Sequence, residues 1–207
     1  MNAFKTAILI GLTGLLSEHA YSNGIHPVVD SDSADDVNAL VDKYLITPSG
    51  VENFLIGAPI PFSLSGYQFK ERIEEAEGES YPLYTVWHGN EELLRIIPQY
   101  DFVEEQYSEK IGQMEIISAK YRTAKGIGVN TTIKEFAQIY PDYYIWYTYI
   151  NGMYVLENDE DYTVQYILSE KDYKGKTIKV SGEINILDRN SFKPNARISK
   201  IRIFGLD

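Results

Sequence analysis

The sequence predicts an α+β fold, a mostly antiparallel β-sheet with two or three short helices. Three observations lead to this class. Apolar residues recur at every second position over most of the chain after residue 80, which is typical of strands. Asn151-Gly152 lies between two such runs and favours a type I′ hairpin turn. Helical spacing of apolar residues is confined to two short segments.

Residues 1–22 of the 207-residue chain are typical of a signal peptide. Lys5 precedes an apolar run over residues 7–16, which is too short to span a bilayer. Small residues at Ala20 and Ser22 predict cleavage before Asn23. A short buried helix or an uncleaved membrane anchor remains the alternative. We expect a periplasmic or secreted protein that has no integral membrane span after cleavage. Residues 23–207 contain no Pro/Ser/Gly-rich linker and are expected to form one α+β domain with a loose start.

Two helices are indicated by capping residues followed by apolar periodicity. Ser33 begins a segment with Val37, Leu40, Val41 and Tyr44 on one face, and Pro48 limits its end. The second helix begins at Thr132, which forms a capping box with Glu135. Its apolar stripe continues to Tyr140, and Pro141 ends it.

The remaining elements are expected to be strands. Two form a hairpin through the short polar connection 88–92, which contains Gly89. Two others flank Asn151-Gly152. The predicted strands are Leu83–Trp87, Leu93–Ile97, Gln113–Tyr121, Tyr143–Ile150, Met153–Glu157, Tyr162–Leu168, Thr177–Leu187 and Ile198–Phe204.

Composition excludes several functions. The net charge of −11 argues against nucleic-acid binding and against binding to anionic membranes, because both need clustered Lys and Arg. There is no cysteine, so thiol catalysis and Cys-ligated metals are impossible. Of three histidines, only His88 lies in the body of the predicted domain, and beside Gly89 it is expected to be a turn residue. We predict no cofactor, no metal site and no catalytic residue.

Three segments are candidates for a phosphate-binding, calcium-binding or catalytic site. Residues 126–131 resemble a phosphate-binding turn, but they lack a third glycine and a P-loop lysine, so we expect a tight strand-to-helix turn. The acidic run 157–161 lacks the spacing of a calcium loop and is expected to be solvated. The glutamates of residues 71–79 suggest the paired carboxylates of a glycosidase, although an exposed loop or sheet edge fits them better.

Aromatic residues provide the candidate ligand-binding side chains. Strand alternation places Tyr144 and Trp146 on one face of their strand and Tyr143, Tyr147 and Tyr149 on the other. One row is expected to be core and the other to form an exposed platform for a sugar or peptide. With Trp87 of the preceding hairpin, Tyr144 and Trp146 are the predicted ligand-binding residues. Ordinary cross-strand aromatic packing is the alternative.

The order of these features resembles the DUF1131 family, RpoE-regulated lipoproteins of the bacterial envelope. The resemblance spans residues 46–204 and depends on pattern and spacing. Its elements are Gly50-Val51 with Ile56, the Val86–Leu93 strand–turn–strand, Ile111–Ser118, the Gly126–Thr132 turn, Tyr166 and Ile198–Ile201. The resemblance implies an envelope location and a fold type, and it transfers no catalytic residue. This chain lacks the lipidation cysteine of such proteins.

The sequence therefore predicts an exported bacterial envelope protein that is a non-enzymatic protein- or ligand-binding module. Its expected partner is another envelope protein or a small amphipathic ligand. A secreted glycan hydrolase that uses paired carboxylates is the alternative. A structural or stress-related envelope component without a discrete site is a third reading.

Overall fold

The computed structural model describes residues 43–205, except 77, 177 and 179–181, and these residues form two β-sheets. The larger sheet has nine strands in the order β12-β9-β10-β11-β13-β7-β6-β5-β4, all antiparallel to their neighbours. Its strands are β4 (Tyr67–Ala76), β5 (Glu79–His88), β6 (Glu91–Asp101), β7 (Gln106–Ile116), β9 (Tyr144–Thr148), β10 (Tyr154–Glu157), β11 (Val164–Leu168), β12 (Ile184–Leu187) and β13 (Ile198–Phe204). The smaller sheet contains β3 (Phe54–Leu55), β2 (Gly50–Val51), β1 (Leu45–Thr47) and β8 (Arg122–Thr123) in that order.

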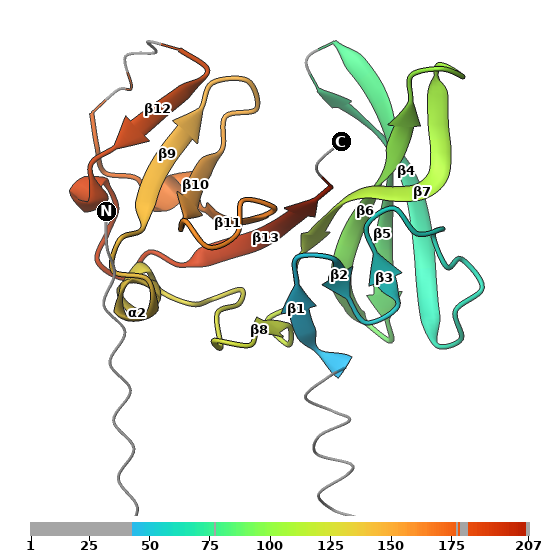
Figure 1. Ribbon diagram of the computed structural model, residues 1–207, viewed down its shortest axis with the longest axis horizontal. Helices are drawn as coiled ribbons and strands as arrows, with labels where there is room; N and C mark the ends of the chain where they lie inside the picture. The colour runs from blue at the N-terminus through green and yellow to red at the C-terminus, as the bar shows by residue number, and fades with distance from the viewer. Residues whose placement is uncertain (1–42, 77, 177, 179–181, 206–207) are drawn as a thin grey trace, which may run out of the picture.

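The large sheet is strongly bent. Figure 1 shows β12, β9 and β10 in one arm and β4, β5, β6 and β7 in the other, with β13 running between the arms along the base. The single described α-helix, α2 (Ile133–Ile139), and the small sheet lie at this base. They cover one face of the large sheet. The opposite face carries none of these elements, although its residues on β10 and β11 are buried as well.

The apolar core lies between the covered face of the large sheet and these elements. Phe136 of α2 packs edge-on against Tyr166 of β11, with ring centroids 5.0 Å apart. Phe54 of β3 packs in the same way against Tyr67 of β4, at 5.7 Å. Both phenylalanines are fully buried. Burying a side chain of this size stabilises the fold by about 1.5–3 kcal/mol.

The sequence of β13 shows how alternation assigns side chains to the two faces. Ile201 and Ile203 are fully buried in the core, whereas Lys200 and Arg202, which alternate with them, are only half-buried. A register shift at Ile167/Leu168 of the partner strand β11 allows Ile198 to enter the core as well. The central strand therefore carries two basic residues on its uncovered face.

The prediction of two or three helices was too high for the described residues, which contain one α-helix and two 3₁₀ turns. The turns are η1 (Glu170–Asp172) and η2 (Arg189–Ser191). They stop after three residues because Tyr173 and Phe192 return to extended backbone and pair with each other as a β-bridge. The capping box of α2 is confirmed: Thr132 accepts a hydrogen bond from the Glu135 amide, and Glu135 accepts one from the Thr132 amide. The helix predicted from Ser33 to before Pro48 lies outside the described residues except at its end, where Leu45–Thr47 forms strand β1 instead.

Most predicted strands occur, but with different ends. The strand predicted over Gln113–Tyr121 stops at Ile116, because the amides of Ile117 and Ser118 both bond to the carbonyl of Leu93 and the chain turns away. Glu71, Glu74 and Glu75 of the Glu-rich stretch lie on β4, an exposed edge strand, as the sheet-edge reading expected, and Glu79 begins β5. Of the strand predicted over 177–187, Ile184–Leu187 forms β12, whereas the described residues 178, 182 and 183 are not in a strand.

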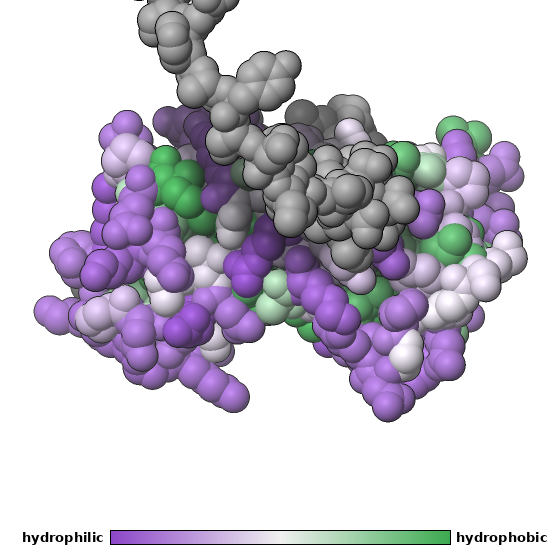
Figure 2. Space-filling view, turned by 90° about the horizontal axis from the view of Figure 1, so that it is seen from below, coloured by the Kyte–Doolittle hydropathy of each residue, from purple (hydrophilic) through white to green (hydrophobic). Residues whose placement is uncertain are grey.

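Seen from below the base, the surface is mainly hydrophilic, with apolar side chains in separate small areas (Figure 2). Within the described part of the chain, no helix has the length and apolar character needed to cross a bilayer.

Candidate functional site

The uncovered face of the large sheet can be traced through cross-strand partners, because directly opposed residues project from the same face. We call it the open face. One row of partners on it runs through Trp146, Val155, Ile167 and Lys200. A second row, beginning two residues further along β13, runs through Arg202, Glu115, Arg95 and Thr85. The two arms of the sheet therefore present their open faces to one another across β13.

A groove of about 420 Å³ lies on the open face where the two arms meet. Its volume falls within the range of small-molecule sites, roughly 300–1,000 Å³. One arm and β13 supply most of its lining, and the β9–β10 hairpin supplies the rest. The lining residues are Tyr81, Ile97, Tyr107, Gln113, Glu115, Lys200 and Arg202, with Asn151 and Met153 from the hairpin.

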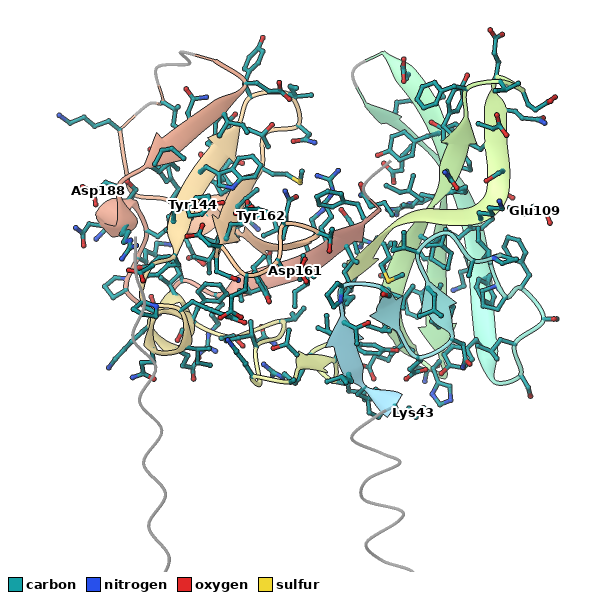
Figure 3. The ribbon with its side chains drawn as sticks, in the orientation of Figure 1. Lys43, Glu109, Tyr144, Asp161, Tyr162 and Asp188 are labelled. Carbon is teal, nitrogen blue, oxygen red and sulfur yellow. The ribbon has the colours of Figure 1, made fainter. Side chains whose placement is uncertain are left out.

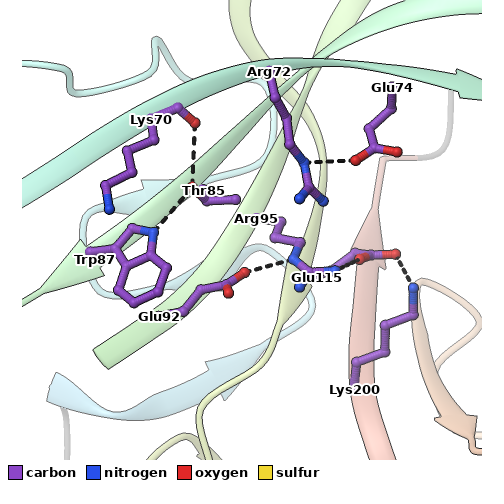
Figure 4. A network of polar contacts seen from close by, with 9 residues as sticks. All are labelled: Lys70, Arg72, Glu74, Thr85, Trp87, Glu92, Arg95, Glu115 and Lys200. Atoms are coloured by element: carbon purple, nitrogen blue, oxygen red, sulfur yellow. Dashed lines mark hydrogen bonds and ion pairs between the residues drawn. The ribbon is translucent and has the colours of Figure 1, made fainter. Parts of the chain in front are cut away.

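A chain of ion pairs crosses the open face beside the groove (Figure 4). Lys200 Nζ lies 2.5 Å from Glu115 Oε1, and Arg95 Nη1 lies 3.8 Å from the other oxygen of Glu115. Arg95 Nε in turn contacts Glu92 Oε1 at 2.6 Å. Burial lowers the pKa of Arg95, but the hydrogen bond and charge of Glu92 outweigh it and the pKa is raised overall. The four side chains therefore form one continuous chain of ion pairs.

Arg202 differs from the other basic residues of this region. Its Nη2 donates a hydrogen bond to Gln113 Oε1 at 2.7 Å, and its guanidinium lies 5.5 Å from the ring of Phe204. Its Nε is fully buried without a hydrogen-bond partner, and no carboxylate of the described residues forms an ion pair with it. Burial lowers the pKa of Arg202, while the charge of Glu115 acts in the opposite direction. The arginine nevertheless stays charged, because a guanidinium is not deprotonated in proteins under ordinary conditions.

A second unpaired atom lies beside Arg202. Gln165 of β11 is the direct cross-strand partner of Arg202 and is only 8% exposed. Its Oε1 is buried without a hydrogen-bond partner. An unsatisfied buried polar group costs about 1–3 kcal/mol. The open face thus holds a buried donor, Arg202 Nε, and a buried acceptor, Gln165 Oε1, on neighbouring strands, and neither forms a hydrogen bond.

The walls of the groove are aromatic and apolar. Burial raises the pKa of Tyr81, and the charges of Glu74 and Glu115 raise it further. Burial likewise raises the pKa of Tyr107. Both phenols are therefore neutral at physiological pH and offer ring surface with a hydroxyl group. Together with Ile97 and Met153 they form a wall suited to a hydrocarbon group.

The three predicted ligand-binding residues all lie on the open face but do not form one site. Five strands separate Trp87 on β5 from Trp146 on β9. Tyr144, labelled on β9 in Figure 3, and Trp146 both bind Glu157, which is 6% exposed, and the Trp146 indole donates to it at 2.6 Å. Trp87 donates to the Thr85 hydroxyl at 3.1 Å and lies under the Lys70 ammonium, 4.5 Å from the ring. Their role in ligand binding stays a prediction.

Sequence reasoning missed the residues at the centre of the groove. Lys200 and Arg202 alternate with buried isoleucines in a run read only as a strand. Two basic side chains at alternate positions of an apolar strand, in an acidic protein, were the available signal. Gln113 gave no such signal, because it lies 89 residues from Arg202 in the sequence and meets it only through the pairing of their strands.

The other segments considered as sites have structural roles. In the 126–131 turn, the amides of Gly126, Gly128 and Asn130 bond to Thr123, Thr131 and Ile198 respectively, so the prediction of a tight turn is confirmed. The glutamates of β4 alternate between its two faces, with Glu74 on the open face and its neighbours Glu71 and Glu75 on the other. Among the described residues, His, Asp and Glu side chains form no group of three that could hold a metal.

Comparison with known proteins gives a likeness of fold. No family model matches the chain, and no curated protein matches its sequence. A solved structure, that of the uncharacterized protein yfeY from Escherichia coli, superposes with a TM-score of 0.53 at 13% identity. The match covers 78% of this chain and 99% of that one. At this identity the likeness shows a shared fold, that of a mostly antiparallel sheet with one helix.

Proposed function

We propose that the protein is an exported bacterial envelope protein that acts as a non-enzymatic binding module and holds a small amphipathic ligand in the groove of the open face. The groove itself is the observation that carries this proposal. It joins an apolar and aromatic wall, which includes Tyr81, Tyr107 and Met153, to a polar floor at Gln113 and Arg202. Small-molecule sites typically combine a largely apolar lining with a few fixed polar groups.

The polar side chains of the groove favour binding over catalysis. Glu115 has both of its carboxylate oxygens in ion pairs, one with Lys200 and the other with Arg95, so neither is free to contact a substrate. His88 lies at the exposed β5–β6 turn, where its ring packs 5.3 Å from that of Tyr67. The residues that surround the groove therefore suit recognition of a ligand better than proton transfer.

The envelope location rests on the sequence. The charged start, the short apolar run and the small residues before Asn23 support export. Cell fractionation with an antibody against the body of the chain tests this part. Recovery from the cytosol with residues 1–22 intact would contradict it.

Ligand binding is tested by purifying the protein from a bacterial envelope extract and identifying bound small molecules by mass spectrometry. Met153→Trp fills the groove from the hairpin. Ile73→Trp is the matched control, because Ile73 is 63% exposed on the other face of edge strand β4. We expect a small molecule enriched with the unchanged chain and with Ile73→Trp, and lost with Met153→Trp.

The proposal is wrong if the unchanged chain and Met153→Trp retain the same small molecules, or if neither retains any. Release of reducing sugar from envelope glycans by the purified chain would instead support the glycan hydrolase alternative.

A further inference from the structure

We propose that the ligand of the groove is an amphipathic organic anion, and that Arg202 binds its acidic group. The inference rests on the proposed function and adds the chemical class of the ligand. The carboxylate or phosphate of such a molecule would bind the guanidinium, and its hydrocarbon part would lie against the groove wall.

The first step is the imbalance of charge on the open face. Arg72, Arg95 and Lys200 each have a carboxylate partner, at 2.7, 2.6 and 2.5 Å respectively. Arg202 has a neutral amide oxygen instead. Because the carboxylates around it are already paired, the groove has an excess of one positive charge. An anionic ligand is the complement to that excess.

The second step is the cost of the empty site. A charge that is largely removed from water and has no counter-charge close by is costly. The Nε–H of Arg202 is buried without an acceptor, so its desolvation is not offset by a bond within the chain. Arginine forms planar, often two-pronged hydrogen bonds with carboxylate and phosphate oxygens. Binding of such an oxygen to the guanidinium would supply the counter-charge that the chain does not provide.

The third step is the surroundings of the guanidinium. Gln113 already fixes its Nη2, which holds the planar group in one orientation. Lys200 lies two residues away on the same face and adds positive potential. The unpaired oxygen of Gln165 is a neutral acceptor, so it adds no negative charge that would repel an anionic ligand. The apolar wall then favours a ligand with a hydrocarbon part over inorganic phosphate or acetate.

Calorimetric titration of the full chain with decanoate and with decanol, at neutral pH and low salt, tests the inference. The two probes share a ten-carbon chain and differ in charge. We expect decanoate to bind at least tenfold more tightly than decanol. Arg202→Met should remove that difference by weakening decanoate at least tenfold while leaving decanol unchanged.

Arg72→Met is the matched control. It removes one positive charge from the same face, but Arg72 pairs with Glu74 outside the groove lining, so decanoate binding should stay within twofold. Circular dichroism shows whether each variant folds. If Arg202→Met does not fold, the comparison of the two probes on the unchanged chain decides.

Decanoate binding no tighter than decanol would overturn the inference, as would a native ligand without an acidic group. In both cases a molecule retained by the unchanged chain and lost with Met153→Trp would leave the proposed function standing. Failure of that retention is a separate result and counts against the proposed function itself.

Discussion

Arg202 on β13 and Glu115 on β7 are direct cross-strand partners, yet Glu115 forms its close ion pair with Lys200, at 2.5 Å. The carboxylate thus binds the basic residue two positions along β13 and leaves its opposite neighbour with Gln113. The two basic residues of one strand therefore have different energetic roles. Lys200 forms an ion pair with a carboxylate that is only 12% exposed, whereas Arg202 forms no ion pair among the described residues.

This difference predicts opposite effects of the same substitution on stability. Lys200→Met should lower the free energy of unfolding by about 1–3 kcal/mol, because Glu115 would keep only Arg95, at 3.8 Å. Arg202→Met should leave it unchanged within about 1 kcal/mol or raise it, since replacing an uncompensated buried charge by an apolar side chain is often stabilising. Urea unfolding followed by circular dichroism gives both values. A larger loss for Arg202→Met would show that its charge is compensated within the chain.

The two tryptophans should also differ. Trp146 donates to the buried carboxylate of Glu157, whereas Trp87 donates to the neutral hydroxyl of Thr85. Hydrogen bonds to charged groups contribute about 1.5–3 kcal/mol and neutral ones about 0.5–1.5 kcal/mol. Trp146→Phe should therefore lower the free energy of unfolding more than Trp87→Phe. Equal losses in urea unfolding would indicate that Glu157 is satisfied by Tyr144 alone.

Local signals explain how much of this fold the sequence predicts. The capping box at Thr132 and the turn signal at Asn151-Gly152 are local, so α2 and the position of the β9–β10 hairpin were predicted correctly. The type I′ turn was wrong, because Asn151 does not have a positive φ and the connection runs from Thr148 to Tyr154. Edge strand β4 was read only as a loop or an edge, because its glutamates dominate its composition. The 3₁₀ turns depend on the pairing of Tyr173 with Phe192, which no local pattern reveals.

The groove was beyond prediction for the same reason. It exists because β13 pairs with both β11 and β7 and so joins the two arms of the sheet. Arg202 lies beside Gln113 and Gln165 because of the order of the strands in the sheet. That order cannot be predicted from the spacing of residues in the sequence. Trp87 and Trp146 were assigned to one site because both are aromatic residues in strands. The bent sheet places them in different arms.

The N-cap of α2 gives a third prediction. Thr132→Ala removes the hydroxyl that accepts from the Glu135 amide at 3.1 Å and should lower the free energy of unfolding by about 1 kcal/mol. Lys134→Ala, at an exposed position of the same helix, is the control and should have little effect. Thermal unfolding compares them, and equal midpoints for the two variants would contradict a role for the cap.

The ion pair of Glu91 with Lys120, at 2.5 Å, predicts a dependence on pH. Hydrogen bonds from Lys120 and Ser118 lower the pKa of Glu91. A carboxyl group whose pKa is lower in the folded state stabilises the fold above its unfolded pKa of about 4.3, and the effect is lost as pH falls through the folded pKa. Glu91→Gln should therefore be less stable than the unchanged chain at pH 7, by roughly 0.2–1 kcal/mol because the pair is exposed.

That stability difference should shrink towards zero as the pH is lowered below about 4. Urea unfolding of both proteins at pH 7, 5 and 3 measures it. A difference that is constant across this range would mean that Glu91 acts through packing, independent of its charge.

The turn before α2 offers a last comparison between two glycines that differ in the reason they are needed. Gly126 has a φ of +80° and open space around it, so Gly126→Ala carries only backbone strain, about 1–2 kcal/mol. At Gly128 a Cβ would lie 2.5 Å from the carbonyl oxygen of Tyr121, a backbone atom of a fully buried residue that cannot move aside. Gly128→Ala should therefore cost about 3 kcal/mol or more, because the turn and the start of α2 must shift. Guanidinium unfolding of the two variants decides between them: if Gly126→Ala is the more damaging, positive φ rather than close packing against Tyr121 is what this turn requires of glycine.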